Sequence, residues 1–118
     1  MAERQEVFKG DTTPQLRVER DGYVLRVARP NDRDAVAHLC ERAWPHGDDY
    51  VPGAWEDWLA DPRGGLLVVE KDGDVVAVAK LSFQSSHEAW LQGLRVDPGH
   101  RRRGLANWIL ANCLELAR

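Results

Sequence analysis

The sequence lacks any long apolar run. None of its 118 residues belongs to a stretch near the roughly 18 consecutive apolar residues that a membrane-spanning helix needs. Residues 1–11 are polar and of mixed charge, so they lack the apolar core of a secretory signal. These two absences predict a cytoplasmic protein that makes no membrane contact.

The sequence also has few cysteines and no net positive charge. The two cysteines, Cys40 and Cys113, have no partners at metal-ligand spacing, which argues against a metal site and a disulfide framework. Both fall on predicted apolar helix faces, so we expect buried free thiols. The net charge of −3 disfavours a nucleic-acid-binding surface. With 43% hydrophobic and 30% charged residues, the chain is predicted to form one globular domain.

Most of the chain follows a regular succession of strand and helix patterns. We expect β-type runs at residues 23–28, 66–71, 75–83 and 88–96, and helices at 33–44, 54–60 and from 102 onward. The order β-α-α-β-β-β-α predicts an α+β fold with a mostly antiparallel sheet. Residues 1–22 are expected to form an N-terminal arm, because residues 1–20 show no convincing β run.

Several finer expectations accompany these elements. Asn31 or Asp32 is expected to cap the first helix, and Asp72-Gly73 is a hairpin signal. The last helix is expected to bury one apolar stripe, made of Leu105, Ala106, Ile109, Leu110, Cys113, Leu114 and Ala117.

The last strand has an interrupted alternation. Leu94 and Val96 share one face, but Leu91 comes three residues before Leu94 and therefore has the opposite parity. Gly93 lies inside the interruption. A glycine at a parity break predicts a β-bulge at this point.

The junction at residues 96–106 is the most informative part of the chain. It reads Val-Asp-Pro-Gly-His-Arg-Arg-Arg-Gly-Leu-Ala, between a strand and a helix. A helix start presents free backbone N–H groups and the positive end of the helix dipole, and Gly104 lets an anion approach the main chain. Three adjacent arginines add donors suited to phosphate, so the junction predicts a pyrophosphate cradle. The alternative is a solvated basic helix start.

The spacing Arg101-x-x-Gly104-x-Ala106 after a strand resembles the acetyl-CoA signature of the GNAT superfamily of N-acyltransferases, Gln/Arg-x-x-Gly-x-Gly/Ala. The order of the predicted elements agrees with that family over residues 23–118. The sequence of residues 88–98, Glu-Ala-Trp-Leu-Gln-Gly-Leu-Arg-Val-Asp-Pro, also resembles that of a GNAT subgroup related to histidine N-acetyltransferases.

The resemblance implies an N-acetyltransferase that moves an acetyl group from acetyl-CoA to a small primary amine or amino acid, without a metal. It implies that the backbone of Leu94, Arg95 and Val96 pairs with pantetheine, while bulge N–H groups polarise the thioester carbonyl. The pyrophosphate would lie against Arg101, Arg102, Arg103, Gly104, Leu105 and Ala106. Arg102 stands where the family often has glycine.

The acceptor side is less clearly marked. The family's acceptor region corresponds here to a segment that contains Trp44, His46, Asp48, Asp49, Tyr50, Trp55 and Trp58. Carboxylates beside aromatic rings suit a cationic amine, but the tryptophans also fit a core and the aspartates a plain loop. Glu88 is the candidate general base, with His87 beside it, and Gln92 is a candidate for orienting water or substrate. Glu88 could equally be a surface residue at a strand end.

A complete GNAT domain has a further strand after the signature helix, whereas this sequence stops at Arg118. The resemblance therefore implies a partial acyl-CoA-binding domain over residues 23–118, with the C-terminal half of the fold missing. This leaves a second function open. A non-catalytic half-domain with an exposed sheet edge and an unpaired apolar helix face would dimerise or bind a complementing chain.

Overall fold

The computed structural model describes residues 16–47, 49–62, 64–83 and 88–116. Within these ranges eight helices and strands follow one another: β1 (Arg17–Arg20), β2 (Tyr23–Val27), α2 (Arg33–Ala43), α3 (Val51–Ala60), β3 (Gly64–Lys71), β4 (Asp74–Phe83), β5 (Ala89–Val96) and α4 (Leu105–Leu116). Two short 3-10 helices, η2 (Pro30–Asp32) and η3 (Pro98–His100), precede α2 and α4 respectively. Among the described residues, no helix has the length and apolarity to span a membrane.

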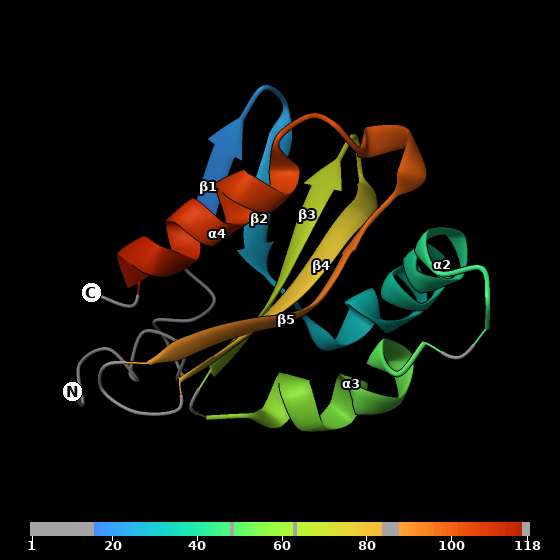
Figure 1. Ribbon diagram of the computed structural model, residues 1–118, viewed down its shortest axis with the longest axis horizontal. Coiled ribbons are helices and arrows are strands. Elements are labelled where there is room, and N and C mark those ends of the chain that lie inside the picture. Colours follow the sequence, from blue (N-terminus) through green and yellow to red (C-terminus); the bar gives the residue numbers. More distant parts are fainter. Residues whose placement is uncertain (1–15, 48, 63, 84–87, 117–118) are drawn as a thin grey trace.

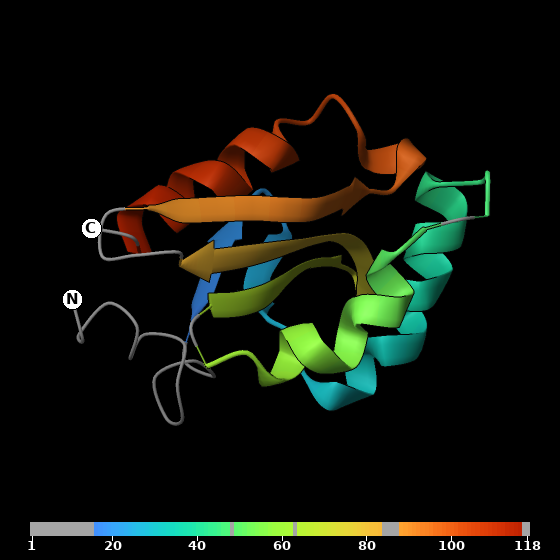
Figure 2. The ribbon, with the colours of Figure 1, turned by 60° about the horizontal axis from the view of Figure 1, so that its bottom comes forward.

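The five strands form one sheet in the order β1-β2-β3-β4-β5, with every neighbouring pair antiparallel. Helices α2 and α3 cover one face of this sheet, and α4 lies against the other (Figures 1 and 2). This confirms the predicted α+β class and the mostly antiparallel sheet. The hairpin at Asp72-Gly73 is also confirmed, and both of its residues have positive φ, as a type I′ turn requires.

Strand β1 corrects the expectation of an arm without strand structure up to residue 22. Residues 17–20 pair with β2 in register from Arg17↔Arg26 to Arg20↔Tyr23. The sequence Arg-Val-Glu-Arg has one apolar residue, so it carries no alternation that a strand pattern could reveal. Backbone pairing across the Asp21-Gly22 turn, where φ is 54° and 84°, forms this strand instead.

The core is split between the two faces of the sheet. Leu25, Leu67, Ala79 and Leu81 pack with α4, while Val68 and Val78 pack with α2 and α3. Strand β4 is buried along nearly its whole length because its neighbouring side chains enter opposite cores. Cys40 and Cys113 are buried free thiols, as predicted.

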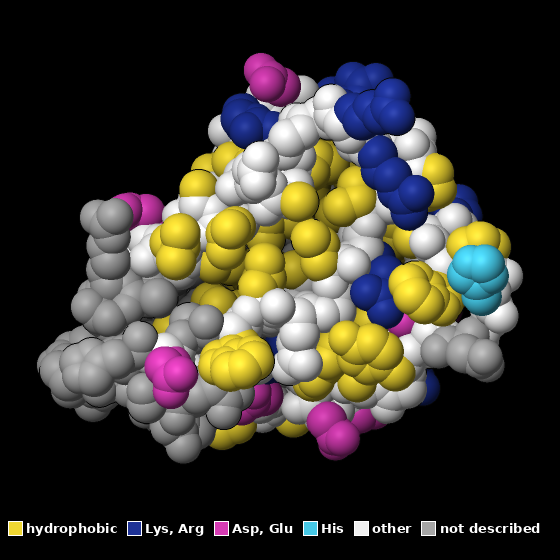
Figure 3. All heavy atoms as spheres, in the orientation of Figure 1, with side chains coloured by type: hydrophobic (Ala, Val, Ile, Leu, Met, Phe, Trp, Pro, Cys, Tyr) yellow, Lys and Arg dark blue, Asp and Glu magenta, His cyan; other side chains and the backbone are white. Residues whose placement is uncertain are grey.

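Helix α4 buries a narrower stripe than its sequence predicts. Leu105, Ile109 and Cys113 are buried, but Leu110 is 43% exposed, Leu114 is 55% exposed, and Ala106 is exposed as well. The buried row and the exposed row each repeat every four residues, so they form two adjacent ridges of which the sheet covers one. Figure 3 shows the resulting gathering of apolar side chains over α4. Ala117 lies outside the described residues.

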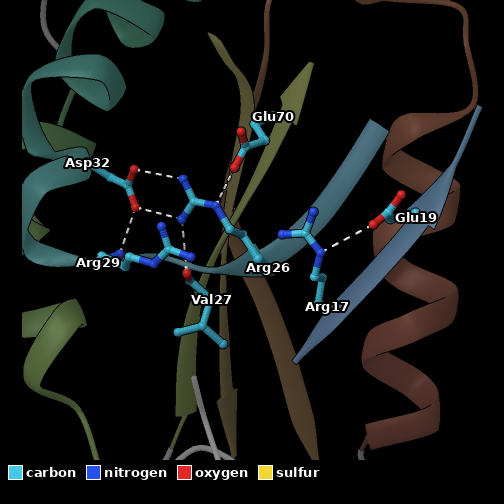
Figure 4. A network of polar contacts seen from close by, with 7 residues as sticks. All are labelled: Arg17, Glu19, Arg26, Val27, Arg29, Asp32 and Glu70. Carbon is cyan, nitrogen blue, oxygen red and sulfur yellow. Dashed lines mark hydrogen bonds and ion pairs between the residues drawn. The ribbon is translucent and has the colours of Figure 1, made fainter. Parts of the chain in front are cut away.

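Helix α2 begins at Arg33 as predicted, but Asp32 does not cap it with its side chain. The Asp32 carboxylate instead accepts two hydrogen bonds from the buried Arg26 guanidinium, at 2.8 and 2.9 Å, and a third from the Arg29 N–H at 2.7 Å (Figure 4). Arg26 also donates to Glu70 at 2.6 Å. Burial opposes ionisation of Asp32, but these hydrogen bonds outweigh it and hold the pKa of the carboxyl below its ordinary value. The network ties β2, β3 and the start of α2 together.

Helix α3 begins at Val51, three residues before the predicted start, because Asp49 precedes it as a local acceptor. The Asp49 Oδ1 atom accepts the Val51 N–H at 2.9 Å. Trp55 is part of the core, in agreement with its helical spacing.

Candidate functional site

The predicted bulge in β5 is present. Gln92 pairs with Lys80 and Arg95 with Val78, so the two residues between them on β5 face the single residue between them on β4. Gly93 has φ 64°, a left-handed conformation that favours glycine. Because β5 is the last strand in the sheet order, its outer edge has no strand partner among the described residues.

Packing also requires glycine at this position. A Cβ atom on Gly93 would lie 2.6 Å from Cη2 of Trp58 and 3.4 Å from Cγ2 of Val51. Both of these neighbours belong to α3, so the helix rests directly on the bulge. The sequence predicts the bulge but not this contact.

The chain leaves β5 through a fixed turn. Asp97 accepts the Gly99 N–H at 2.9 Å and the Arg42 Nε–H at 2.6 Å, and its own N–H donates to Val76 at 2.8 Å. Burial opposes the Asp97 charge, but the hydrogen bonds from Gly99 and Arg42 prevail and keep its pKa below the ordinary value. The start of α4 is therefore held against β4 and α2.

The backbone of the predicted cradle contains two left-handed residues. Arg102 and Gly104 have φ of 64° and 74°, on either side of Arg103, and turns of this kind can direct backbone N–H groups toward an anion. The first hydrogen bond of α4 joins the Trp108 N–H to the Gly104 carbonyl at 2.9 Å. By helix geometry, the N–H groups of residues 105–107 then have no acceptor within the helix. Helix α4 thus starts three residues later than predicted.

Two surface hollows join this cradle to the bulge. One, of about 290 Å³, is lined by Val96, His100, Arg101, Arg102, Gly104, Leu105, Ala106 and Asn107. The other, of about 320 Å³, is lined by Ala43, Trp44, Leu94, Arg95, Val96 and Arg101. Val96 and Arg101 line both, so the hollows adjoin along the end of β5. Every predicted cofactor-binding residue except Arg103 lines one of them.

The three arginines of the cradle differ in their contacts. Arg101 donates to the backbone carbonyls of Val96 at 3.2 Å and Ala43 at 3.3 Å, which links β5 to the end of α2. Arg102 and Arg103 are exposed. Figure 3 shows basic side chains gathered over the loop between η3 and α4.

Arg20 is a further cation at the cradle, which sequence reasoning missed. From β1 it donates to the Arg103 carbonyl at 3.0 Å, and its guanidinium lies 4.9 Å from the centre of the Trp108 ring. The only signal in the sequence is the Asp21-Gly22 turn, which brings the end of β1 back beside β2.

The acceptor-side candidates fall into distinct environments. Asp49 is not a plain loop residue, because it forms an ion pair with Arg95 through two contacts of 3.0 Å each. Trp44 is 42% exposed rather than part of the core, and Trp58 is half-buried under Tyr50, with ring centres 5.8 Å apart. His46 is exposed and meets the edge of Trp44. Asp48 lies outside the described residues.

The candidate base Glu88 is exposed and immediately precedes β5. Glu88 comes five positions before Gly93, which places it about 17 Å from the bulge at the usual rise of a strand. Its catalytic role stays a prediction. Gln92 is exposed beside the bulge, and His87 lies outside the described residues.

Comparisons with known proteins agree with this geometry. A model of the "Acetyltransferase (GNAT) family" matches residues 27–118. The histidine N-acetyltransferase of Scomber australasicus is 30% identical over 110 residues, which cover 91% of this chain and 32% of the relative. The chain therefore spans about a third of the length of this curated relative.

Solved structures share the fold. A putative acetyltransferase from Pyrococcus horikoshii superposes with a TM-score of 0.72 at 22% identity, covering 86% of this chain and 36% of the other. AAC(6')-Iy, solved in complex with the bisubstrate analog CoA-S-monomethyl-acetylneamine, has a TM-score of 0.63 at 22% identity, with coverages of 80% and 70%.

Proposed function

We propose that this chain, which belongs to the GNAT family of acetyltransferases, binds acetyl-CoA and serves the transfer of its acetyl group to a small primary amine or amino acid. The acyl-CoA-binding domain in this proposal spans residues 23–118, with β1 added to its sheet. The observation that carries the proposal is the continuous path from the cradle at residues 101–106 to the bulge in β5.

The cradle fits the pyrophosphate of coenzyme A in charge and in donor geometry. Backbone N–H groups at the start of α4 converge with the left-handed turns at Arg102 and Gly104. The exposed Arg102 and Arg103 would add charge-assisted hydrogen bonds to phosphate oxygens. Arg20 would hold the Arg103 carbonyl back, away from the anion.

The outer edge of β5 fits the pantetheine arm. Backbone groups of Leu94, Arg95 and Val96 would pair with its amides, as a neighbouring strand would. The bulge would direct an N–H group toward the thioester carbonyl, where negative charge grows during attack. Acetyl-CoA supplies the electrophilic carbon: the amine nitrogen bonds to it, the C–S bond breaks, and the sulfur leaves as a thiolate that takes up a proton.

The amine must lose a proton before or during attack. In this proposal Glu88, about 17 Å along β5 from the bulge, accepts it through ordered water molecules rather than by direct contact. Replacing Glu88 with glutamine should then lower kcat by about 10²-fold or more, as for other general bases. An unchanged kcat in Glu88→Gln would assign the role to another group.

Calorimetric titration with acetyl-CoA tests the binding site. The double variant Arg102→Ala/Arg103→Ala should bind at least about tenfold more weakly, because each charge-assisted hydrogen bond contributes about 1.5–3 kcal/mol. Arg33→Ala is the matched control, since Arg33 is an exposed arginine that pairs with Glu56 on α3, away from the cradle. Absence of acetyl-CoA binding, or equal weakening in the control, contradicts the proposal.

Acceptor choice is tested by release of the coenzyme A thiol with L-histidine and neamine as probes. Both are suggested by the names of the similar proteins. Acetylation of either probe supports a small-amine acceptor, whereas thiol release with neither contradicts these two classes.

The exposed apolar residues favour a second function. Trp90 on β5 is 57% exposed, and Leu110 and Leu114 on α4 are 43% and 55% exposed. A chain that uses the exposed row of α4 to dimerise or to bind a complementing chain would sediment as more than a monomer, and Leu114→Gln would return it to a monomer. Monomeric behaviour in the wild-type chain contradicts the dimer.

A further inference from the structure

Arg95 and Asp49 form an almost buried ion pair between β5 and the loop that precedes α3. Arg95 Nε lies 3.0 Å from Asp49 Oδ2, and Arg95 Nη2 lies 3.0 Å from Asp49 Oδ1. The side chains are 13% and 7% exposed. Two parallel N–H···O bonds fix the direction of the guanidinium as well as its position.

Arg95 also contacts the bulge itself. Its Nη1 donates to the Leu94 carbonyl at 3.0 Å, and Leu94 is one of the two bulge residues. Asp97, two residues later, donates its N–H to Val76 of β4, so the Arg95 N–H also faces β4 and the Leu94 carbonyl faces the outer edge. Because the peptide that joins Leu94 to Arg95 is planar, holding this carbonyl fixes the peptide that ends the bulge. A bulge interrupts the regular ladder of hydrogen bonds between strands. A side chain that bonds to a peptide group of the bulge therefore fixes an orientation that the ladder leaves open.

The surroundings leave the pair little freedom. The guanidinium lies 5.0 Å from the centre of the Trp44 ring and 5.4 Å from that of Tyr50. Asp49 accepts the Val51 N–H at 2.9 Å in addition to the two bonds from Arg95. Three hydrogen bonds and the pairing with Arg95 make Asp49 a poor partner for a cationic amine, contrary to the sequence-based suggestion.

Stability alone does not account for such a pair. A buried ion pair is often no more stabilising than apolar residues of the same size. On this side of the sheet, Leu39, Val51 and Trp55 already join α2 and α3 to the core. The contribution of the pair is instead to fix the direction of the peptide group that joins Leu94 to Arg95.

We propose that Arg95 and Asp49 are positioning residues, which set the bulge of β5 in the geometry that polarises the thioester carbonyl. They contact no substrate through their side chains and act through the backbone of β5. This inference rests on the proposed function, because the thioester is assigned to the bulge there.

The test compares two aspartates with the same chemistry. Asp49→Asn removes the charge that holds Arg95, whereas Asp32→Asn removes the charge of an equivalent two-bond pair with Arg26. Asp32, like Asp49, also accepts a backbone N–H. We would record the amide resonances of Gly93 and Leu94 in the chain without ligand. We would then record the infrared stretch of the thioester carbonyl of ¹³C-labelled acetyl-CoA bound to each variant, with affinity measured by calorimetry.

We expect Asp49→Asn to displace the two bulge resonances and to lose the lowering of the carbonyl stretch that the wild type imposes. Asp32→Asn should keep both, despite a similar loss of stability. Unchanged resonances in Asp49→Asn, or equal changes in Asp32→Asn, overturn the inference. Should Asp49→Asn fail to fold, Arg95→Lys replaces it, because one ammonium group cannot make the three contacts of the guanidinium.

Failure of the proposed function gives a different result. A wild-type chain that binds no acetyl-CoA overturns that proposal through the calorimetry alone. The amide resonances need no ligand, so they still decide whether the pair holds the bulge.

Discussion

Replacing Gly93 with alanine tests how the bulge is built, and its effect can be worked out from the structure. The left-handed φ of 64° adds about 1 kcal/mol for a residue that has a side chain. The new Cβ would lie 2.6 Å from Cη2 of Trp58, so the indole must move, and such overpacking costs about 2 kcal/mol more. We therefore expect a loss of about 3 kcal/mol, which corresponds to a Tm lower by about 10 °C.

Two other glycines separate the contributions. Gly104 also has positive φ, 74°, but the nearest atom to its added Cβ is 3.7 Å away, so alanine there should lose only about 1 kcal/mol. Gly53 lies in the first turn of α3 with open space around it, and alanine should stabilise the helix by about 0.5 kcal/mol.

Urea unfolding followed by tryptophan fluorescence measures all three variants, and the emission of the folded state reports the displacement of Trp58. The reasoning is refuted if Gly93→Ala is no less stable than Gly104→Ala, because the contact with Trp58 would then contribute nothing.

Three further predictions concern other parts of the molecule. Arg102→Gly should raise the free energy of unfolding by about 1 kcal/mol, because φ of 64° suits glycine, while acetyl-CoA binding weakens; urea and calorimetric titrations would show whether the two effects have these opposite signs. Arg20→Ala should weaken acetyl-CoA binding by about tenfold in calorimetry, whereas Arg17→Ala on the same strand should leave it unchanged, and equal effects would contradict the role of Arg20. Burial raises the pKa of Cys40 to about 12 and of Cys113 to about 11, so both thiols should resist a thiol reagent at pH 8 until urea is added. Because these pKa values are raised on folding, the stability they contribute is complete below pH 9 and should decline above it, which urea midpoints across the alkaline range would measure.

The sequence predicts features whose cause is local in the chain. The interrupted alternation at Leu91, Gly93 and Leu94 predicts the bulge, and the Asp72-Gly73 pair predicts the hairpin. Both predictions succeed because a bulge or a tight turn depends on residues that are adjacent in the sequence. Spacing likewise predicts the cradle, because its donors come from consecutive residues.

Features that join distant parts of the chain were not predictable in this way. The pairing of Arg95 with Asp49 depends on how the loop folds back over β5, and no spacing encodes it. Strand β1 arises from pairing rather than from apolar pattern, so its residues carry no signal of their own. The exposed row of α4 depends on how much of that helix the described sheet covers. The helical period of the sequence does not predict this coverage.

The order of strands in the sheet also has a consequence for how the chain reaches this structure. All four strand pairings of the described sheet join consecutive strands, and three of them join strands with a short connection: β1 with β2, β3 with β4, and β4 with β5. The pairing of β2 with β3 must close a long connection, which contains α2 and α3. Because closing a long loop is the slow, entropically unfavourable event in folding, we expect this pairing to set the folding rate. Substitutions at the buried Leu25 and Val69, which pair across it, should then slow folding more than they speed unfolding.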